Sequence, residues 1–437
     1  MELFLVSYKQ SMFTKKTLKN GVRMVLVPYQ DTKAATLLVL FRVGSRYETD
    51  PLNGASHFLE HLYFKGTHKR PTTLDISREL DAVGAEYNAF TGKDHTGYYI
   101  KITSEHLPLA ADILEDMLLH SKFEAKELDR ERTVVTEEIH MYEDNPIMFV
   151  DELLEGEVFR GSTLGWRISG SREHIAKMDR DAMLRYRKDY YVPRETVVAV
   201  AGRYTDATVK QIEKYFSKPF PWQSNERKQF KKFSLASAGY TAPRIKVHFK
   251  DTNQVQCAIG FPSYAMNHPQ HDALSILSVI LGGTMSSRLF VEVREKKGLA
   301  YMVRSSAQPF EDTGIFTIQA GLDKSRINEA ITTILAEVKK IVDKGVTAQE
   351  LKDAKENVRG RFVLNLEESN ELANFVGKQE LFLKKIYTPE ERLKRFSAVT
   401  REQVHATARD IFKTPRMSMA LIGPYKDAEP FQKLLHL

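Results

Sequence analysis

Residues 180–216 read RDAMLRYRKDYYVPRETVVAVAGRYTDATVKQIEKYF, and residues 401–437 align with them without a gap at an offset of 221. The matched pairs include Arg180 with Arg401, Asp189 with Asp410, Gly202 with Gly423, Tyr204 with Tyr425 and Asp206 with Asp427. A second similarity, at an offset of 217, pairs residues 96–102 with residues 313–319. Two similarities in the same order and at similar offsets predict two homologous domains of about 210–220 residues each.

The join between the two domains is expected where regular structure is interrupted. Pro219 and Pro221 break it, a basic run follows at residues 227–232, and Gly239 lies at the end of the segment. We therefore predict a first domain at residues 1–219, a linker at 220–240 and a second domain at 241–437.

The order of strand-like and helix-like patterns in the first half predicts the fold class. Apolar alternation indicates strands, and apolar residues at every third or fourth position indicate helices. Strands are expected at residues 33–43, 86–90, 97–102 and 196–201, and helices at 54–65, 73–84, 107–120, 124–142 and 205–216. Because strands and helices do not alternate singly, we predict an α+β fold with helices on one face of a largely antiparallel sheet.

Composition places the chain among ordinary globular proteins. Its 437 residues, 42% hydrophobic and 28% charged, suit two or three domains. No stretch approaches the roughly 18–20 apolar residues of a membrane span. Residues 1–20 also lack the features of a secretory signal. The expected location is therefore cytoplasmic, with no membrane partner.

Cysteine content and charge exclude further classes. The single cysteine, Cys257, rules out an intramolecular disulfide and a cysteine-rich metal site, and its apolar surroundings predict a buried strand position. The net charge of +7 is modest for this length. We interpret the basic run at residues 227–232 as a solvated connector rather than a nucleic-acid patch, so no nucleic-acid partner is expected.

Residues 54–64 read GASHFLEHLYF and combine two histidines with a glutamate on one expected helix. His57 and His61 are four residues apart, so they project from the same face about one turn apart. Two imidazole nitrogens in that arrangement can lie roughly 2 Å from one zinc ion. Glu60 lies near that face, where it can take a proton from a water whose pKa the zinc has lowered to roughly 7. This H-x-x-E-H order is the inverzincin signature of metallopeptidases.

The alternative interpretation is a solvated helix face without a metal. It fits poorly with the apolar neighbours Phe58, Leu59, Leu62, Tyr63 and Phe64. Such a helix is largely buried, and burying two histidines with a carboxylate costs free energy unless they are paired or bind a metal. The sequence therefore favours a metal site.

A hydrolytic zinc ion takes three protein ligands and leaves a position for water, so a third ligand is expected on another element. The helix expected at residues 124–142 and the residue after it offer several candidates. These are Glu131, Glu137, Glu138, His140 and Glu143. Spacing alone does not select among them.

The chain resembles the pitrilysin/insulinase family of zinc peptidases, close to the bacterial homologues of mitochondrial processing peptidase. In that family a later helix supplies the third ligand, a glutamate with another glutamate seven residues before it. Here Glu138 lies 77 residues after His61, the family's spacing, and Glu131 lies seven before Glu138. The resemblance implies that His57, His61 and Glu138 hold one Zn2+ per chain. It also implies that Glu60 is the general base and that Glu131 orients and charge-balances the site.

Two further stretches carry the resemblance. Asn88-Ala89-Phe90-Thr91 is similar to the family's edge strand, to which an extended substrate adds through backbone hydrogen bonds. Arg294 and Tyr301, seven residues apart, are similar to its C-terminal substrate motif. Arg294 would then grip a substrate carbonyl, and Tyr301 would stabilise the developing oxyanion.

The second half is expected to bind no metal. At the offset of 217, His57, Glu60 and His61 fall on Leu274, Leu277 and Ser278, which cannot hold zinc. The resemblance therefore implies a division of labour, in which the first half supplies the metal and the base and the second half binds substrate.

The implied function is a zinc-dependent endopeptidase that hydrolyses unfolded peptides or leader sequences inside a closed chamber. The family's chamber contains four such domains and this chain contains two, so we expect a homodimer with peptide substrates as its partners. The alternative is a non-catalytic structural or partner subunit of a peptidase-like complex. Because such subunits typically lose the metal residues, which are present here, it is less favoured. A third interpretation, an unrelated zinc-binding interaction module, is weaker still.

Overall fold

The structure, a computed structural model, describes residues 12–222, 228–383 and 385–437. Residues 1–11, part of the stretch searched for a signal, lie outside the described residues, as do 223–227 of the predicted linker and residue 384. The chain forms two compact units, each built from three separate stretches. The first unit comprises residues up to Thr136, Ile168–Phe230 and Val363–Pro389; the second comprises Glu137–Arg167, Lys231–Phe362 and Glu390–Leu437. The predicted division of the sequence at residues 219 and 241 stays a prediction.

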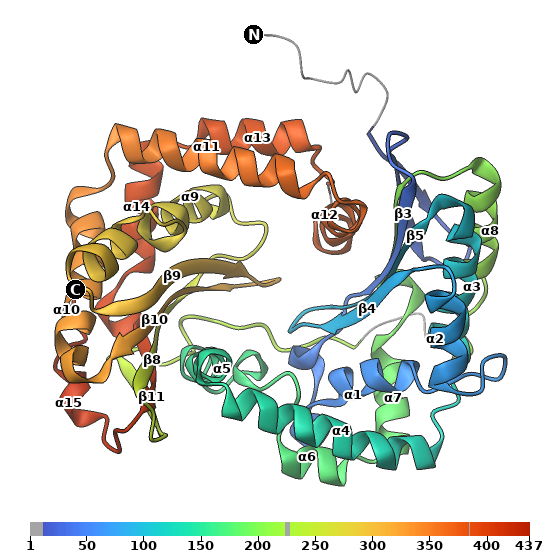
Figure 1. Cartoon of the computed structure of the whole chain (residues 1–437), viewed down its shortest axis with the longest axis horizontal. Helices are drawn as coiled ribbons and strands as arrows, with labels where there is room; N and C mark the ends of the chain where they lie inside the picture. Colours follow the sequence, from blue (N-terminus) through green and yellow to red (C-terminus); the bar gives the residue numbers. More distant parts are fainter. Residues whose placement is uncertain (1–11, 223–227, 384) are drawn as a thin grey trace. The chain divides into compact units, whose positions relative to one another are not determined.

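Over the described residues, the sheet of the first unit has six strands in the order β1-β2-β6-β3-β5-β4. Strands β3, β5 and β4 of this sheet are labelled in Figure 1. Their bounds are β1 Thr14–Thr17, β2 Arg23–Pro28, β3 Ala34–Phe41, β4 Glu86–Thr91, β5 Thr96–Thr103 and β6 Thr196–Gly202. Strands β2 and β6 are parallel, and the other neighbouring pairs are antiparallel. Strand β4 forms one edge of this sheet.

The second unit repeats this arrangement with five strands, as far as the structure describes it, in the order β7-β11-β8-β10-β9. Their bounds are β7 Arg244–Phe249, β8 Gln254–Ser263, β9 Ala300–Pro309, β10 Gly314–Asp323 and β11 Ser418–Gly423. Strands β7 and β11 are parallel, as β2 and β6 are in the first unit. Strands β5 and β10, and β6 and β11, carry the two repeated stretches of sequence. The predicted α+β fold of two homologous, mostly antiparallel sheets is confirmed.

Helices of both units surround these sheets. The first unit contains α1 Ala55–Tyr63, α2 Thr73–Asp81, α3 Leu107–His120, α6 Arg172–Lys177, α7 Arg180–Tyr190, α8 Asp206–Phe216 and α12 Ser369–Phe382. The second contains α5 Pro146–Val158, α9 His271–Gly282, α10 Ile327–Lys344, α14 Arg401–Ile411 and α15 Glu429–Gln432, and most of α11 Ala348–Asn365 and α13 Pro389–Ala398. One continuous helix, α4 Ala125–Asp144, begins in the first unit and ends in the second. None of the helices in the described residues combines the length and apolar character needed to cross a bilayer.

Each sheet has helices on both faces, and on one face the covering helix comes from the other half of the sequence. Helix α12 packs on the first sheet, where its apolar side chains meet Val25, Leu38, Leu40, Val197 and Ala199. Helix α5 packs on the second sheet in the same way, against Ala258, Ala420 and Ile422. The expectation that helices cover one face only was wrong. The apolar pattern of one half cannot reveal a covering helix that the other half supplies.

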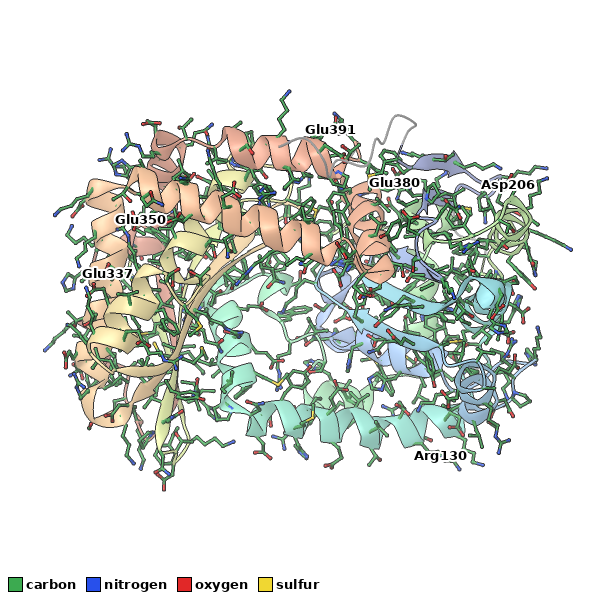
Figure 2. The ribbon with its side chains drawn as sticks, turned by 45° about the horizontal axis from the view of Figure 1, so that its top comes forward. Arg130, Asp206, Glu337, Glu350, Glu380 and Glu391 are labelled. Atoms are coloured by element: carbon green, nitrogen blue, oxygen red, sulfur yellow. The ribbon has the colours of Figure 1, made fainter. Side chains whose placement is uncertain are left out.

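Polar contacts fix α12 on the first sheet. Glu380, labelled in Figure 2, is buried and its carboxylate pairs with Lys15 of β1 at 2.7 Å and Arg23 of β2 at 3.3 Å. At the other end of α12, the hydroxyl of Ser369 lies 2.8 Å from the hydroxyl of Thr36 on β3. A buried carboxylate with two cationic partners is compensated for its loss of hydration. These contacts therefore set the position of α12 on the sheet.

Candidate metal centre

The helix that carries the two histidines, α1, begins at a constrained turn. Gly54 precedes it with φ +99°, and a Cβ at this position would lie 2.6 Å from the carbonyl oxygen of Ser169, so only glycine fits. The carboxylate of Glu48 accepts hydrogen bonds from the backbone N–H groups of Gly54 at 2.8 Å and Ser56 at 2.7 Å. Burial raises the pKa of Glu48 to about 7, although these hydrogen bonds act in the opposite direction. Glu48 therefore satisfies backbone donors at the start of α1, where no helical partner exists.

The two histidines of α1 face one another. Their Nε2 atoms are 3.4 Å apart, and the rings meet edge to face with centroids 4.6 Å apart. Nδ1 of His61 lies 2.8 Å from Oε1 of Glu131 on α4. A histidine whose Nδ1–H donates to a carboxylate presents Nε2 to a metal, as ligating histidines commonly do.

The third member of the group is Glu138, two turns after Glu131 on α4. Ligand atoms of His57, His61 and Glu138 all lie within 4.8 Å of one another, and this is the one group of its kind found among the described residues. The other acids differ in environment. The Glu137 side chain is 72% exposed, and Glu143 pairs with Arg167 at 2.7 Å. Of the candidates that spacing left open, Glu138 is the one that the described structure places in a group with both histidines.

The separation of the two histidine nitrogens fits a shared zinc ion. Zn–N bonds of about 2.1 Å at tetrahedral angles separate two nitrogen ligands by about 3.4 Å. The two Nε2 atoms of His57 and His61 are separated by 3.4 Å. Two imidazoles and one carboxylate are the ligand set of a hydrolytic site and leave one position for water. By donor type and spacing, these residues suit zinc.

Glu131 forms an ion pair with Lys65 in addition to its contact with His61. Its Oε2 lies 2.6 Å from Nζ of Lys65, and its side chain is almost fully buried. Burial raises the pKa of Glu131, but the hydrogen bonds from His61 and Lys65 outweigh burial and hold that pKa below its usual value. Glu131 is therefore a carboxylate at neutral pH, as its predicted supporting role requires.

Glu60 and the predicted substrate strand lie together. The hydroxyl of Thr91, the last residue of β4, donates to Oε2 of Glu60 at 2.5 Å. Asn88, Ala89 and Phe90 precede Thr91 on β4, which within the described residues pairs only with β5. The structure thus places the predicted base beside an edge strand.

Arg294 and Tyr301 meet in the second unit. The Arg294 guanidinium lies 4.6 Å from the ring centroid of Phe290 and 5.5 Å from that of Tyr301. Arg294 belongs to a short π-helix at Phe290–Lys296. Tyr301 is the extra residue of a β-bulge, because Met302 pairs with Gly321 and Ala300 with Leu322, and its side chain is 74% exposed. Bulges and π-helices often re-aim side chains at functional sites.

The positions that correspond to the metal residues in the second unit belong to its core. Leu274 and Leu277 of α9 are buried in the apolar cluster beneath the helix, and Ser278 is buried beside them. The repeated fold is thus kept there with apolar packing in place of the histidines and the base.

Sequence reasoning missed two supporting side chains, Glu48 and Lys65. Glu48 lies six residues before Gly54, outside the spacing at which capping residues are sought. Lys65 lies four residues after His61, one turn farther along the same side, and this spacing could have indicated a shared partner.

Two family profiles match the chain. The profile of insulinase (peptidase family M16) matches residues 23–172, and that of the peptidase M16 inactive domain matches residues 177–358. The uncharacterized zinc protease YmxG of Bacillus subtilis is 38% identical over 413 residues, which cover 94% of this chain and 98% of the relative. This chain belongs to the M16 peptidase family. An uncharacterized zinc protease of Streptomyces coelicolor is 36% identical over 416 residues, covering 95% of this chain and 90% of that protein.

Solved structures share the fold of this M16 family member. A protease from Helicobacter pylori superposes with a TM-score of 0.84 at 24% identity, covering 94% of this chain and 99% of that chain. A structure described as a peptidase M16 inactive domain, from Pseudomonas fluorescens, gives a TM-score of 0.86 at 18% identity, covering 95% and 98%. The resemblance to the pitrilysin/insulinase family is confirmed.

Proposed function

We propose that this M16 family member is a zinc-dependent endopeptidase whose metal is held by His57, His61 and Glu138. The observation that carries the proposal is the convergence of these three side chains, with ligand atoms within 4.8 Å of one another. Relatives named zinc proteases support the choice of metal. One zinc ion per chain is expected, because Leu274 and Leu277 occupy the matching positions of the second unit.

The proposed chemistry is hydrolysis of a peptide bond. A bound zinc ion would polarise the scissile carbonyl and lower the pKa of a coordinated water to about 7. Glu60 takes a proton from the attacking water as the water oxygen bonds to the carbonyl carbon. It then gives that proton to the leaving nitrogen as the C–N bond breaks, which yields a carboxylic acid and an amine. Glu131 keeps His61 oriented through the hydrogen bond at Nδ1.

The proposed substrate is an extended, unfolded peptide or leader sequence. Edge strand β4 offers backbone groups of Asn88–Thr91 to which such a peptide adds as a further strand. The Thr91–Glu60 hydrogen bond keeps this edge next to the base. A peptide paired with β4 would therefore run past the metal residues of α1.

The second unit is proposed to bind the substrate at the reacting bond. Arg294 would hold a substrate carbonyl and Tyr301 would stabilise the oxyanion, roles that suit a guanidinium beside an exposed phenol. We further propose a homodimer that encloses the sites in a chamber, since a closed chamber admits unfolded peptides and excludes folded proteins. Sedimentation at twice the mass of the chain would support the dimer, and sedimentation as a monomer would contradict it.

The alternative of a non-catalytic structural or partner subunit is not favoured. Such a subunit has no need of a complete ligand set, whereas here both histidines, Glu138 and the supporting Glu131 converge. A zinc-loaded protein that cleaves no peptide in a diverse library would instead support this alternative.

The test is cleavage of a peptide library by zinc-loaded protein, read by mass spectrometry. Replacing Glu60 by Gln should keep bound zinc but lower kcat by about 10²–10⁴-fold, because the general base is lost. The matched control is Glu137→Gln, which removes an exposed carboxylate on α4 and should change neither zinc content nor kcat. Full activity of Glu60→Gln would refute the assignment of the base.

A further inference from the structure

Thr91 joins the edge strand to the base through its own side chain. Its backbone belongs to β4, and its hydroxyl donates to Oε2 of Glu60 at 2.5 Å. We propose that Thr91 is a positioning residue for Glu60, holding its carboxylate through Oε2 in the orientation needed for proton transfer. The inference rests on the proposed function and adds to it a link between substrate pairing and the orientation of the base.

The position of Thr91 is fixed by the hairpin that contains it. Thr91 is paired with Thr96 of β5, whose hydroxyl donates to the carbonyl oxygen of Val43 at 2.8 Å. The backbone N–H of Gly92 donates to the carbonyl oxygen of His95 at 2.8 Å and closes the turn. The donor to Glu60 therefore stands on a regular, paired strand end.

A second connection ties this hairpin to the start of α1. Arg46 forms a buried ion pair with Asp94 of the hairpin at 2.7 Å, and the backbone N–H of Ser45 donates to the carbonyl oxygen of Gly92 at 3.2 Å. Glu48, two residues after Arg46, accepts the backbone hydrogen bonds of Gly54 and Ser56. Strand end and helix are thus held together at two places, so the distance from Thr91 to Glu60 is set by rigid elements.

The contact is of the type that orients a carboxylate strongly. A hydrogen bond from a hydroxyl to a carboxylate is stronger than one between neutral groups, and Thr91 donates such a bond to Oε2 of Glu60. The carboxylate of Glu60 is then held through Oε2 by the end of β4. Because a peptide that adds to β4 pairs with the same strand end, its placement and the direction of the base depend on one residue.

The test compares two substitutions of Thr91 in the full-length, zinc-loaded protein. Thr91→Val keeps the β-branched shape and removes the donor, and it should lower kcat about 10- to 100-fold, since hydrogen bonds to charged groups are worth this much. KM, the zinc dissociation constant and the thermal midpoint should change little. Thr91→Ser restores the hydroxyl and should recover most of kcat.

The matched control is Thr96→Val, which removes the paired hydroxyl across the hairpin. That hydroxyl binds the carbonyl oxygen of Val43 and not Glu60, so its loss should lower the thermal midpoint more than kcat. In a Glu60→Gln background, Thr91→Val should cause no further loss of kcat.

The outcomes separate this inference from the proposed function. If Glu60→Gln abolishes cleavage but Thr91→Val keeps kcat within twofold, the inference fails and the peptidase proposal stands. If Thr91→Ser fails to restore kcat, or the loss lies in KM or in thermal stability, Thr91 has a structural or substrate-binding role instead. If wild type cleaves nothing, the proposed function fails first.

Discussion

At the residue scale, the acids of α4 differ in what they contact rather than in chemical type. Glu131 is buried against His61 and Lys65, Glu138 reaches the two histidines, and Glu137 is exposed. The sequence alone predicted the face that Glu131 and Glu138 share, because seven residues make two helical turns. It could not tell which acid faces the histidines, since that depends on how α4 is rotated against α1.

Zinc affinity is the property that distinguishes these acids. Glu138→Gln should weaken zinc binding by more than about 100-fold, because even supporting residues of a metal site contribute 10- to 100-fold. Glu137→Gln, its neighbour, should leave the affinity unchanged. A competition titration against a chromogenic chelator measures both. Equal affinities of the two variants would remove Glu138 from the ligand set.

At the element scale, the sequence predicted the elements of the site well. The helix expected at residues 54–65 is α1 at Ala55–Tyr63, and the one expected at 124–142 is α4 at Ala125–Asp144. Periodicity does not encode the π-helix around Arg294 or the bulge at Tyr301, since each is a one-residue departure from regular pairing. Nor could it show that α12 packs on the sheet that contains the β4–β5 hairpin, because an apolar helix face does not indicate which element it contacts.

His95 contacts both β4 and α12, and it should make the stability of the fold depend on pH. It lies in the turn after β4, with its ring 5.6 Å from Phe90 and 5.5 Å from Phe382 of α12. Burial, and then the nearby Lys378, lower its pKa to about 3. Between that value and about 6.5, the pKa of an unfolded histidine, only the unfolded state binds the proton. Stability is therefore full above about pH 6.5 and is lost as pH falls through this window.

The expected size follows from these two pKa values. From pH 7.5 to pH 5.0, His95 should account for a loss of about 2 kcal/mol in unfolding free energy. His95→Gln carries no titrating ring, so its stability should depend less on pH by that amount. Urea unfolding of metal-free protein measures this through Trp222 of the first unit, in a Trp166→Phe background. Identical pH dependence with and without His95 would contradict the assignment.

At the scale of the whole molecule, the two units share one fold, and they differ in the residues at the positions of the metal site. In both sheets the last strand in sequence pairs in parallel with an early strand, β6 with β2 in the first unit and β11 with β7 in the second. Helix α1, which follows β3 in the first unit, carries the two histidines of the site; α9, which follows β8 in the second unit, has Leu274 and Ser278 at the matching positions, and Leu277 in place of the base. The two repeated stretches of sequence predicted this likeness. Helix α12 of the second half of the sequence covers the first sheet, and α5 of the first half covers the second sheet. Neither half alone could predict this packing.

The central claim is that His57, His61 and Glu138 bind one hydrolytic zinc ion. The most direct measurement is an anomalous difference map, collected at the zinc edge from crystals of the zinc-loaded Glu60→Gln variant. We predict one peak per chain, about 2.0–2.2 Å from Nε2 of both histidines and from a carboxylate oxygen of Glu138. A map without a peak among these residues, or with the peak on other side chains, would contradict the account.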